Sequence, residues 1–411
     1  MSTIRDITLA PEGEQKIAWV ARNMPLLTSI AEDFKKSKPF AGLKVALSVH
    51  LEAKTAYLCR VMAMGGAEMH ITGSNPLSTK DEIAAALVAG DLEVHAVYGC
   101  TEEEYYDHID RVLEIGPNII IDDGGDLVQR MHTKFAHLLP GVIGSCEETT
   151  TGIIRLKQMA KAGTLLFPAV MVNDADCKHL FDNRYGTGQS VWDGIMRTTN
   201  LIVAGKTVVV GGYGWCSRGI AMRAAGLGAS VIVTETDPIR ALEAVMDGYR
   251  VMPMAEAAKL GDIFCTATGN CDIITTEHFK EMKDGAILAN AGHFNVEVAM
   301  EELEAYAVEK YEARKNIEGY RLPSGKTVFV LAEGRLVNIA AGDGHPAEIM
   351  DMSFAIQALS AKYLADNRGK LEPGVIPVPR ETDLAVAERK LRTMDIAIDT
   401  LTEKQAAYIG V

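Results

Sequence analysis

The chain has 411 residues, enough for two or three domains that each bury a core. Its hydrophobic content of 48% and charged content of 23% are typical of a water-soluble globular protein. A formal net charge of −14 argues against nucleic acid or an anionic membrane as a partner, since both would repel an acidic protein.

No segment predicts export or membrane insertion. The longest apolar stretch, Leu165–Val172, is too short to span a bilayer and contains Pro168. The N-terminus carries charged residues and no apolar stretch, unlike a secretory signal. The seven cysteines form neither a CxxC pair nor a metal-ligand spacing, which favours reduced thiols. We therefore expect a cytoplasmic protein without a metal site.

The first half of the chain alternates strand-like and helix-like patterns. Short β-branched runs predict strands, and amphipathic patterns between them predict helices. The strands are expected at Leu43–Val49, Met69–Thr72, Val94–Val97, Asn118–Ile121 and Leu165–Val172, and two of the helices at Ala53–Ala63 and Thr79–Ala89. This alternation predicts an open parallel sheet with helices on both faces.

A dinucleotide-binding pattern begins near Gly205, in GKTVVVGGYGWCSRGIAMRAAGLGASVIVTETDP. Thr207–Gly211 reads as a buried strand, and the turn Gly212–Gly214 opens a helix whose N-terminus favours a pyrophosphate. A second strand, Ser230–Thr234, leads to Glu235, and an acid there binds the ribose hydroxyls of NAD and repels the phosphate of NADP. Ser217 replaces the third glycine, but it is small enough for close packing. The alternative is an α/β turn that binds nothing.

The pattern becomes helical after Gly344. Pro346 is placed as a first helical residue, and Leu384–Met394 reads as an amphipathic helix in a packing or oligomerisation tail. We predict a substrate-binding domain (1–185, completed by about 346–377), an NAD-binding domain (190–344) and a C-terminal dimerisation segment (378–411).

Polar residues cluster where the predicted strands end, which is where open α/β sheets bind ligands. The clusters are His50–Glu52, Asp122–Asp126, Ser145–Gly152, Asn173–Asn183 and Ala289–Phe294.

These clusters, in this order, resemble the S-adenosylhomocysteine hydrolase family. The strings DDGGD, EETTTG, FDN, GYG, TE-DP, GHF, LAEGRLVN and GHP carry the resemblance, which covers nearly the whole chain. The resemblance implies two Rossmann-like, doubly wound parallel-sheet domains joined by hinges, a short helical C-terminal segment, and a homo-oligomer, which we expect to be a tetramer. It extends to the archaeal and thermophile branch that includes S-inosylhomocysteine hydrolase.

The family chemistry is an internal redox cycle. Bound NAD oxidises the ribose at C3′, the C4′ proton becomes acidic, homocysteine leaves from C5′, water adds, and the hydride returns. By resemblance, Lys178 activates the 3′-hydroxyl with Asp182 and Asn183, Asp123 takes the C4′ proton, His50 assists the water and the leaving sulfur, and Glu148 holds the ribose hydroxyls.

The resemblance also assigns binding residues. Those expected to contact substrate are Glu52, Lys54, Thr149, His293, His345, Met350 and Phe354. Those expected to contact NAD are Thr149, Thr150, Thr151, Asn183, Gly212, Tyr213, Gly214, Glu235, Thr268, Asn270, Gly292, His293, Asn338 and His345.

Several of these residues have a purely structural alternative. Ser145 and Glu148 have the spacing of a capping box for a helix from Thr149 to Lys161. Lys178 and Asp182 have the i, i+4 spacing of a surface ion pair, and Lys178 must lose its proton to act as a base. Asp122 and Asp126 can cap or turn the Gly-Gly loop.

Two features depart from better-known members of the family. The chain stops before a tail whose lysine and tyrosine reach a neighbour's NAD, so NAD exchange is expected to be faster. Glu52 and Lys54 stand where many members have threonine and glutamate or glutamine facing adenine. An ammonium group cannot accept a hydrogen bond from the adenine amine, but it can donate to the 6-oxo group of hypoxanthine. The alternative is that Lys54 pairs with Glu52 and reads nothing.

Two other function classes share some of these features. A conventional NAD-dependent dehydrogenase would release NADH and accumulate an oxidised product. A non-catalytic, NAD-responsive binding protein would be expected to lose the bases or ribose-binding residues, and all of these are present.

Overall fold

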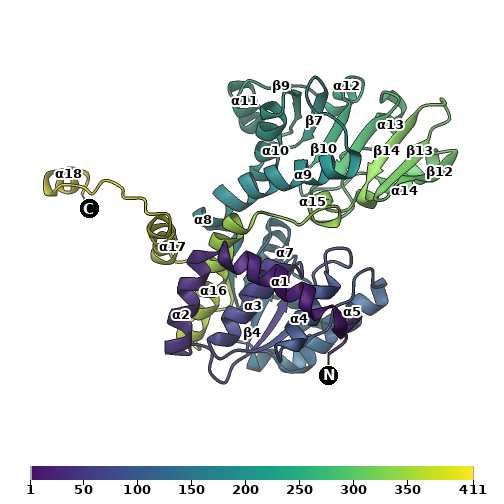
Figure 1. Cartoon of the computed structure of the whole chain (residues 1–411). Coiled ribbons are helices and arrows are strands. Elements are labelled where there is room, and N and C mark those ends of the chain that lie inside the picture. Colours follow the sequence, from purple (N-terminus) through teal and green to yellow (C-terminus); the bar gives the residue numbers. More distant parts are fainter. Residues whose placement is uncertain (1, 411) are drawn as a thin grey trace.

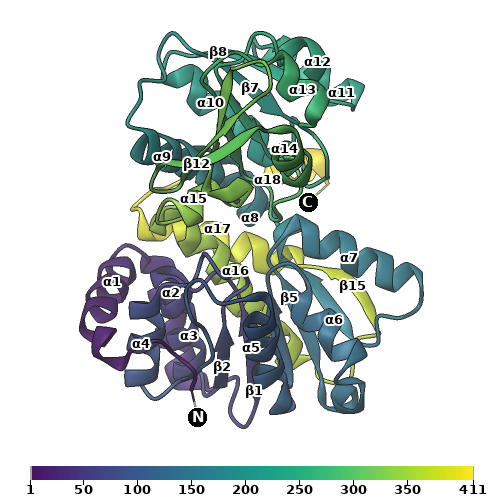
Figure 2. The same ribbon diagram turned by 90° about the vertical axis from the view of Figure 1, so that its right-hand side faces the viewer.

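The computed structural model describes residues 2–410 and contains two α/β lobes, one above the other in Figures 1 and 2. Each lobe is built on one open sheet. The chain completes most of the lower lobe, builds the upper lobe, and then returns to the lower lobe. This path places residues distant in sequence at the boundary between the lobes.

The lower sheet has seven parallel strands in the order β15-β6-β5-β4-β1-β2-β3. Its strands are β1 (Lys44–Ser48), β2 (Glu68–Thr72), β3 (Glu93–Val94), β4 (Ile119–Asp122), β5 (Gly144–Glu147), β6 (Pro168–Met171) and β15 (Gly374–Pro377). The central strands are short and almost wholly buried, as both faces are covered by helices.

Two apolar cores lie on the two faces of this sheet. One is formed with α1 (Ala10–Arg22), α2 (Pro25–Ser37), α3 (Ala53–Met64), α4 (Asp81–Ala89) and α16 (Ala347–Asp366). The other is formed with α5 (Glu102–Glu114), α6 (Asp126–Thr133) and α7 (Thr150–Lys161). Burial on both faces fixes the register of the strands and therefore which residues end at the upper edge.

The upper sheet has the order β12-β13-β14-β11-β10-β7-β8-β9. Its strands are β7 (Thr207–Gly211), β8 (Ser230–Thr234), β9 (Arg250–Val251), β10 (Ile263–Thr266), β11 (Ala286–Asn290), β12 (Glu309–Arg314), β13 (Ile317–Arg321) and β14 (Thr327–Leu331). All pair in parallel except β12 with β13 and β13 with β14. The helices α9 (Thr187–Thr199) and α10 (Trp215–Gly226) pack in one core, and α12 (Met254–Ala257), α13 (Thr276–Glu281) and α14 (Met300–Tyr306) in the other. The sheet also carries α11 (Pro238–Met246) after β8.

Two connections join the lobes. The first runs through α8 (Asp176–Lys178), the π-helix η4 (His179–Gly186) and α9. The second runs through α15 (Val337–Ala340) into α16. The C-terminal α17 (Arg380–Thr393) packs on α16 and α2, whereas α18 (Glu403–Ile409) stands away from the body at the end of an extended arm (Figure 1).

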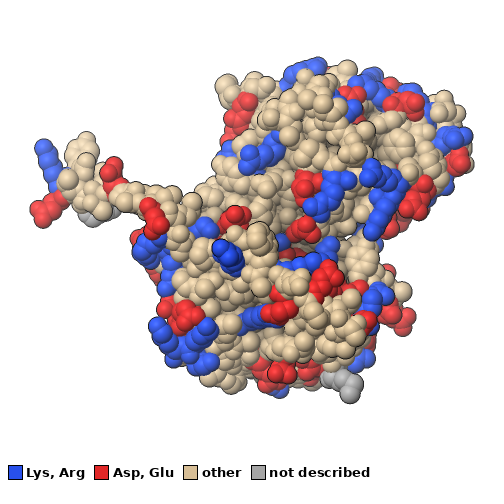
Figure 3. Space-filling view, viewed as in Figure 1, with Lys and Arg blue, Asp and Glu red and all other residues tan. Residues whose placement is uncertain are grey.

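The surface seen in Figure 3 carries acidic and basic side chains interspersed over both lobes. No helix within residues 2–410 is both long and apolar enough to cross a bilayer.

The predicted fold class is confirmed: two mostly parallel, doubly wound sheets, with helical C-terminal elements. Element ends differ in places. The strand expected at Val94–Val97 pairs only at Glu93–Val94, Leu165–Val172 shortens to Pro168–Met171, and Pro346 precedes the first helical residue, Ala347. The domain boundaries at 185, 190, 344 and 378 remain proposals.

Candidate active site

A cavity of about 290 Å³ lies between the lobes and is lined by residues of both. The carboxyl ends of β1, β4, β5 and β6 face it from below, and those of β7, β10 and β11 face it from above. Parallel strands collect their ends at one edge, so both sheets present their polar loops to the same space. The cavity brings together most of the site residues that the sequence suggested.

Lys178 is the last residue of α8, directly before the π-helix η4, and it is buried. Its Nζ donates to Asn173 Oδ1 at 3.0 Å and to Asn183 Oδ1 at 2.9 Å. Asn183 also donates to Asn173 Oδ1, at 3.0 Å, which closes a small ring of hydrogen bonds. The ion pair considered for Lys178 and Asp182 is present, but it is buried and not on the surface.

Two carboxylates flank the lysine. Lys178 Nζ is 3.4 Å from Asp182 Oδ2 and 3.6 Å from Glu148 Oε1. Burial disfavours the charged lysine, but Asp182 and Glu148 outweigh it and raise the pKa of Lys178. Burial alone would raise the pKa of Asp182, but Lys178 and His345 lower it. Burial raises the pKa of Glu148 to about 8, although Lys178 opposes this. The ammonium group of Lys178 therefore keeps Asp182 ionised, whereas Glu148 holds a proton near neutral pH.

The two carboxylates are oriented by α16, which returns from the upper lobe. Ser353 donates to Asp182 Oδ2 at 2.8 Å, and Gln357 donates to Glu148 Oε2 at 2.6 Å. These polar residues, four apart, lie on one helix face, next to the cavity-lining Met350 and Phe354. The sequence did not indicate Ser353 and Gln357, because other polar residues such as Asp351 and Ser360 are also buried on α16 and no local pattern sets these two apart.

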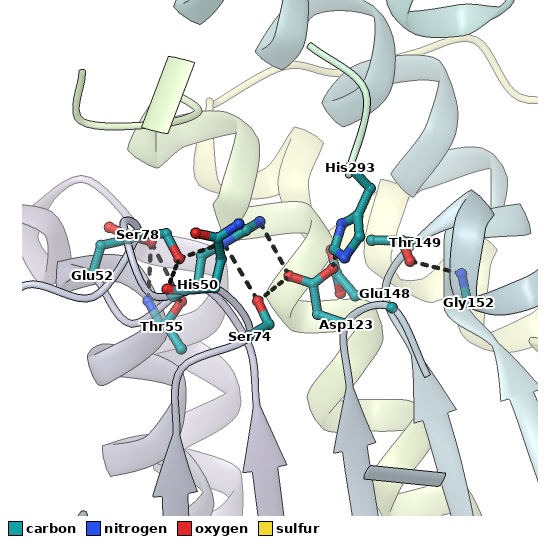
Figure 4. Close-up of polar contacts among 12 residues, drawn as sticks. His50, Glu52, Thr55, Ser74, Ser78, Asp123, Glu148, Thr149, Gly152 and His293 are labelled. Atoms are coloured by element: carbon teal, nitrogen blue, oxygen red, sulfur yellow. Dashed lines mark hydrogen bonds and ion pairs between the residues drawn. The ribbon is translucent and has the colours of Figure 1, made fainter. Parts of the chain in front are cut away.

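A second group of acid–base residues, His50, Asp123 and His293, lines the same cavity (Figure 4). Ser74 donates to Asp123 Oδ2 at 3.1 Å, and His50 Nε2 is 3.5 Å from the same oxygen. His293 reaches down from the upper lobe, with Nδ1 3.9 Å from Asp123 Oδ1. Burial lowers the pKa of His50 despite the nearby carboxylate, which favours the neutral imidazole. Within residues 2–410, His50, Asp123 and His293 are the one group of three such side chains close enough to share a metal ion.

The loop that carries Asp123 is held by two acids below it. Asp122 accepts from the backbone N–H groups of Asp123 and Val128, which confirms that it turns the Gly-Gly loop. Glu147 Oε1 accepts from Gly124 N at 2.9 Å and Thr149 N at 3.0 Å. The expected capping box is wrong: Ser145 lies inside β5.

Thr149 is the residue that caps α7, because its hydroxyl accepts from Gly152 N at 3.0 Å (Figure 4). Glu148 is therefore free of a capping role, and its side chain faces Lys178.

Glu52 and Lys54 form an ion pair at the other end of the cavity. Lys54 Nζ is 2.6 Å from Glu52 Oε2 and donates to Asp343 O at 2.8 Å. Glu52 also caps α3 by accepting from the N–H groups of Lys54 and Thr55. Two of the three ammonium protons of Lys54 are thus used, and both side chains still line the cavity.

The glycine turn of the upper lobe fits a dinucleotide. Gly212 has a φ of 84°, which residues with a side chain rarely adopt. Gly214 faces open space: a Cβ atom added there would have only Arg240 Nη1 near it, at 3.9 Å. Glu235 ends β8 and accepts from Tyr213 N at 2.7 Å. Ser217, at the third glycine position, is buried and donates to Gly211 O and Ala267 O, so it closes the turn.

Most remaining predicted residues also line the cavity. They are Thr150, Thr151, Thr268, Gly292, Asn338, His345, Met350 and Phe354. Four do not line it: Gly212, Tyr213, Glu235 and Asn270. The Tyr213 side chain points into the upper lobe and donates to Asp247, so only its backbone faces the turn. Asn270 is exposed, and its side chain accepts from Cys271 N.

Comparison with known proteins agrees with this arrangement. The family model for S-adenosyl-L-homocysteine hydrolase matches residues 1–138, and the model for the NAD-binding domain of the same enzyme matches residues 183–344. The chain is 58% identical to an adenosylhomocysteinase of Thermococcus kodakarensis over 99% of this chain and 96% of that protein. It is 57% identical to an S-inosyl-L-homocysteine hydrolase of Methanococcus maripaludis (100% and 99%) and 59% identical to one of Methanosarcina mazei (98% and 97%).

Proposed function

The chain belongs to the S-adenosyl-L-homocysteine hydrolase family, and on that premise we propose that it hydrolyses S-adenosyl-L-homocysteine reversibly to adenosine and L-homocysteine. The observation that carries the proposal is one cavity that joins a buried lysine–carboxylate group to a dinucleotide turn. NAD is the cofactor of this family, and when bound it accepts and returns the hydride at the ribose 3′ carbon.

The residues fit that cofactor. Gly214 lines the cavity without a side chain, at the turn where a pyrophosphate would lie, and Glu235 follows the second strand as a proposed acceptor for ribose hydroxyls. Thr149 and Asn183 line the same cavity as Gly214 and Lys178.

Lys178 is the proposed acceptor of the 3′-hydroxyl proton. Asn173 and Asn183 fix its Nζ, and Lys178 lines the cavity. A lysine must be neutral to act as a base, and burial of Lys178 favours the neutral form, against the charges of Asp182 and Glu148.

Asp123 is the proposed acceptor of the C4′ proton. It lines the same cavity as Lys178, and Ser74 orients its carboxylate. Neutral His50 beside it can take a proton from water or give one to the leaving sulfur. His293 would bring the upper lobe onto this group when substrate is bound.

A second candidate substrate is S-inosyl-L-homocysteine, and Lys54 is the observation that favours it. Its third ammonium proton can be donated to the 6-oxo group of hypoxanthine, while Glu52 can accept from the N1–H beside it. Adenine presents the opposite order of donor and acceptor on the same edge. The preferred purine base of the substrate therefore depends on whether Lys54 or Glu52 contacts position 6.

We further propose that the protein works in the cytoplasm as a homotetramer. Apolar residues exposed on the C-terminal arm, including Ile398, Leu401 and Tyr408, support contact with another copy.

The test is thiol release by the purified, NAD-loaded enzyme, given the adenosyl or the inosyl thioether in parallel. Turnover of either supports the proposed reaction, and thiol from neither substrate would refute it. Lys54→Gln should shift the preference towards the adenosyl substrate if Lys54 meets position 6. Lys44→Gln is the matched control, because Lys44 begins β1 at the end away from the cavity. An unchanged preference in Lys54→Gln would remove the lysine from base recognition.

A further inference from the structure

The helix that carries Lys178 begins without a capping side chain of its own. Ala175 occupies the N-cap position of α8, with extended φ and ψ of −66° and 141°, and has no group that can accept a hydrogen bond. The first N–H groups of a helix have no partner within it, so those of Asp176 and Cys177 need an acceptor from elsewhere. This is an unusual start for a segment that must hold a buried lysine.

Asp383, on the C-terminal helix α17, supplies that acceptor. Its Oδ2 accepts from Asp176 N at 2.7 Å, and its Oδ1 accepts from Cys177 N at 2.9 Å. Asp383 is 5% exposed, and the Cys177 thiol donates to its backbone oxygen at 3.4 Å. A carboxylate at the N-terminus of a helix is favoured by the helix dipole as well as by these hydrogen bonds.

The cap lies directly beside the catalytic group. Lys178 follows Cys177 in sequence, and its own N–H donates to Ala175 O at 3.0 Å. Fixing Asp176 and Cys177 therefore fixes the point from which the Lys178 side chain starts toward Asn173 and Asn183.

The capping helix is itself tied to the rest of the lower lobe. Lys390, further along α17, pairs with the buried Asp351 of α16 at 2.8 Å. Asp351 in turn accepts from Leu26 N and Leu27 N, the first turn of α2. The C-terminal helix is thus held at two points, one of them at the start of the catalytic segment.

We propose that Asp383 is a positioning residue for Lys178, acting through the start of α8. The inference rests on the proposed function, in which Lys178 takes the 3′-hydroxyl proton. On this proposal, α17 contributes to proton transfer at Lys178 as well as to any contact between subunits.

The experiment measures how fast NAD bound to the full-length enzyme is reduced after mixing with adenosine or inosine, whichever is turned over. Rates are expressed per bound NAD, so that loss of folded protein does not affect them. Asp383→Ala should lower this rate on the order of 10- to 100-fold, with a smaller change in KM, because a shift of about 1 Å in a reacting group has such an effect. Asp383→Asn keeps one acceptor and should fall between Asp383→Ala and the unmodified enzyme.

Arg380→Ala is the matched control. Arg380 is exposed and pairs with Asp176 Oδ2 at 2.5 Å and, more loosely, with Asp383 Oδ2 at 3.7 Å, so its removal takes a neighbouring charge away but leaves both hydrogen bonds of the cap in place. Its removal should change the rate less than about twofold, since exposed ion pairs contribute little. An Asp383→Ala rate per bound NAD equal to that of the unmodified enzyme would overturn the inference.

Lys178→Met separates this inference from the proposed function. If Lys178→Met reduces bound NAD at the unmodified rate, the proposed role of the lysine is wrong. If Lys178→Met is inactive while Asp383→Ala is unaffected, only the positioning role is wrong. Thermal melting of each variant shows whether the protein measured is folded.

Discussion

Lys178 donates a hydrogen bond to Asn183, five residues further along the same helical segment. That segment is wound as a π-helix from His179 to Gly186, in which residues five apart lie on one face. Asn183 and Asp182 can therefore both reach the lysine, where a regular α-helix would favour one of them. The contacts of Lys178 with both Asp182 and Asn183 therefore depend on this irregular helix, which lies between the two lobes.

Asn173 gives the first prediction. It accepts from both Lys178 and Asn183, so Asn173→Asp keeps the acceptors and adds a third negative charge beside the lysine. The added charge should raise the pKa of Lys178 further and lower the neutral fraction at a given pH. The rate of NAD reduction should fall at neutral pH and recover part of its loss as pH rises. A loss independent of pH would show that Asn173 acts through shape alone.

Glu148 gives a prediction about stability. Burial raises its pKa to about 8 from the ordinary value of 4.5, so between these values the folded protein binds a proton that the unfolded chain releases. Stability should therefore fall as pH rises through that window, and level off above it. Glu148→Gln removes the titrating group.

The measurement is Tm against pH for protein stripped of NAD. The Tm of Glu148→Gln relative to the unmodified protein should increase from about pH 4.5 to about pH 8, the two ends of the pKa shift. Parallel curves would mean that Glu148 stays ionised in the folded protein. Activity of the variant should be lost throughout, if Glu148 holds the ribose hydroxyls.

The sequence predicts the two sheets well, because their strands are continuous apolar runs between turn residues. Thr207–Gly211 and Ser230–Thr234 occur as predicted. The same reasoning places His50 and Asp123 at strand ends, where they meet. Such inferences succeed where a local pattern and its burial agree.

Other parts of the site depend on contacts that no local pattern specifies. Lys178 and Asp182 have the spacing of a surface pair, and nothing in that spacing reveals a π-helix or its burial. The partner of Glu148 is Gln357, 209 residues away, on a helix that returns from the other lobe. Ser145 has the spacing of a cap but lies in a buried strand, because the sheet extends further than the turn residues suggest.

Gln357 gives the third prediction. Its amide donates to Glu148 Oε2. Gln357→Met replaces it with a side chain of similar size that cannot donate, so that buried oxygen would lose its hydrogen-bond partner. A buried acceptor left without a hydrogen bond costs about 1–3 kcal/mol, so kcat/KM should fall roughly 5- to 150-fold. Gln158→Met, at an exposed position of α7, is the control and should be nearly neutral. Equal activity of the two variants would contradict an orienting role for Gln357.

Gly219 gives the last prediction, which concerns the packing of the hinge. A Cβ at Gly219 would lie 1.7 Å from the backbone oxygen of Arg184, in the π-helix η4, so the two helices touch through their backbones. Gly219→Ala must push η4 away from α10, and overpacking of this kind costs about 1–3 kcal/mol. Because η4 carries Asp182 and Asn183, NAD retention and turnover should fall as well.

Gly226 lies in the same helix and provides the comparison. A Cβ there meets nothing within 4 Å, so Gly226→Ala should stabilise the protein by up to about 1 kcal/mol through helix propensity. Urea unfolding gives the two free energies, and NAD content after gel filtration reports retention. Opposite signs for the two substitutions are expected. A Gly219→Ala protein as stable and as well loaded with NAD as Gly226→Ala would show that α10 and η4 separate freely, and that their close contact does not hold the lysine segment in place.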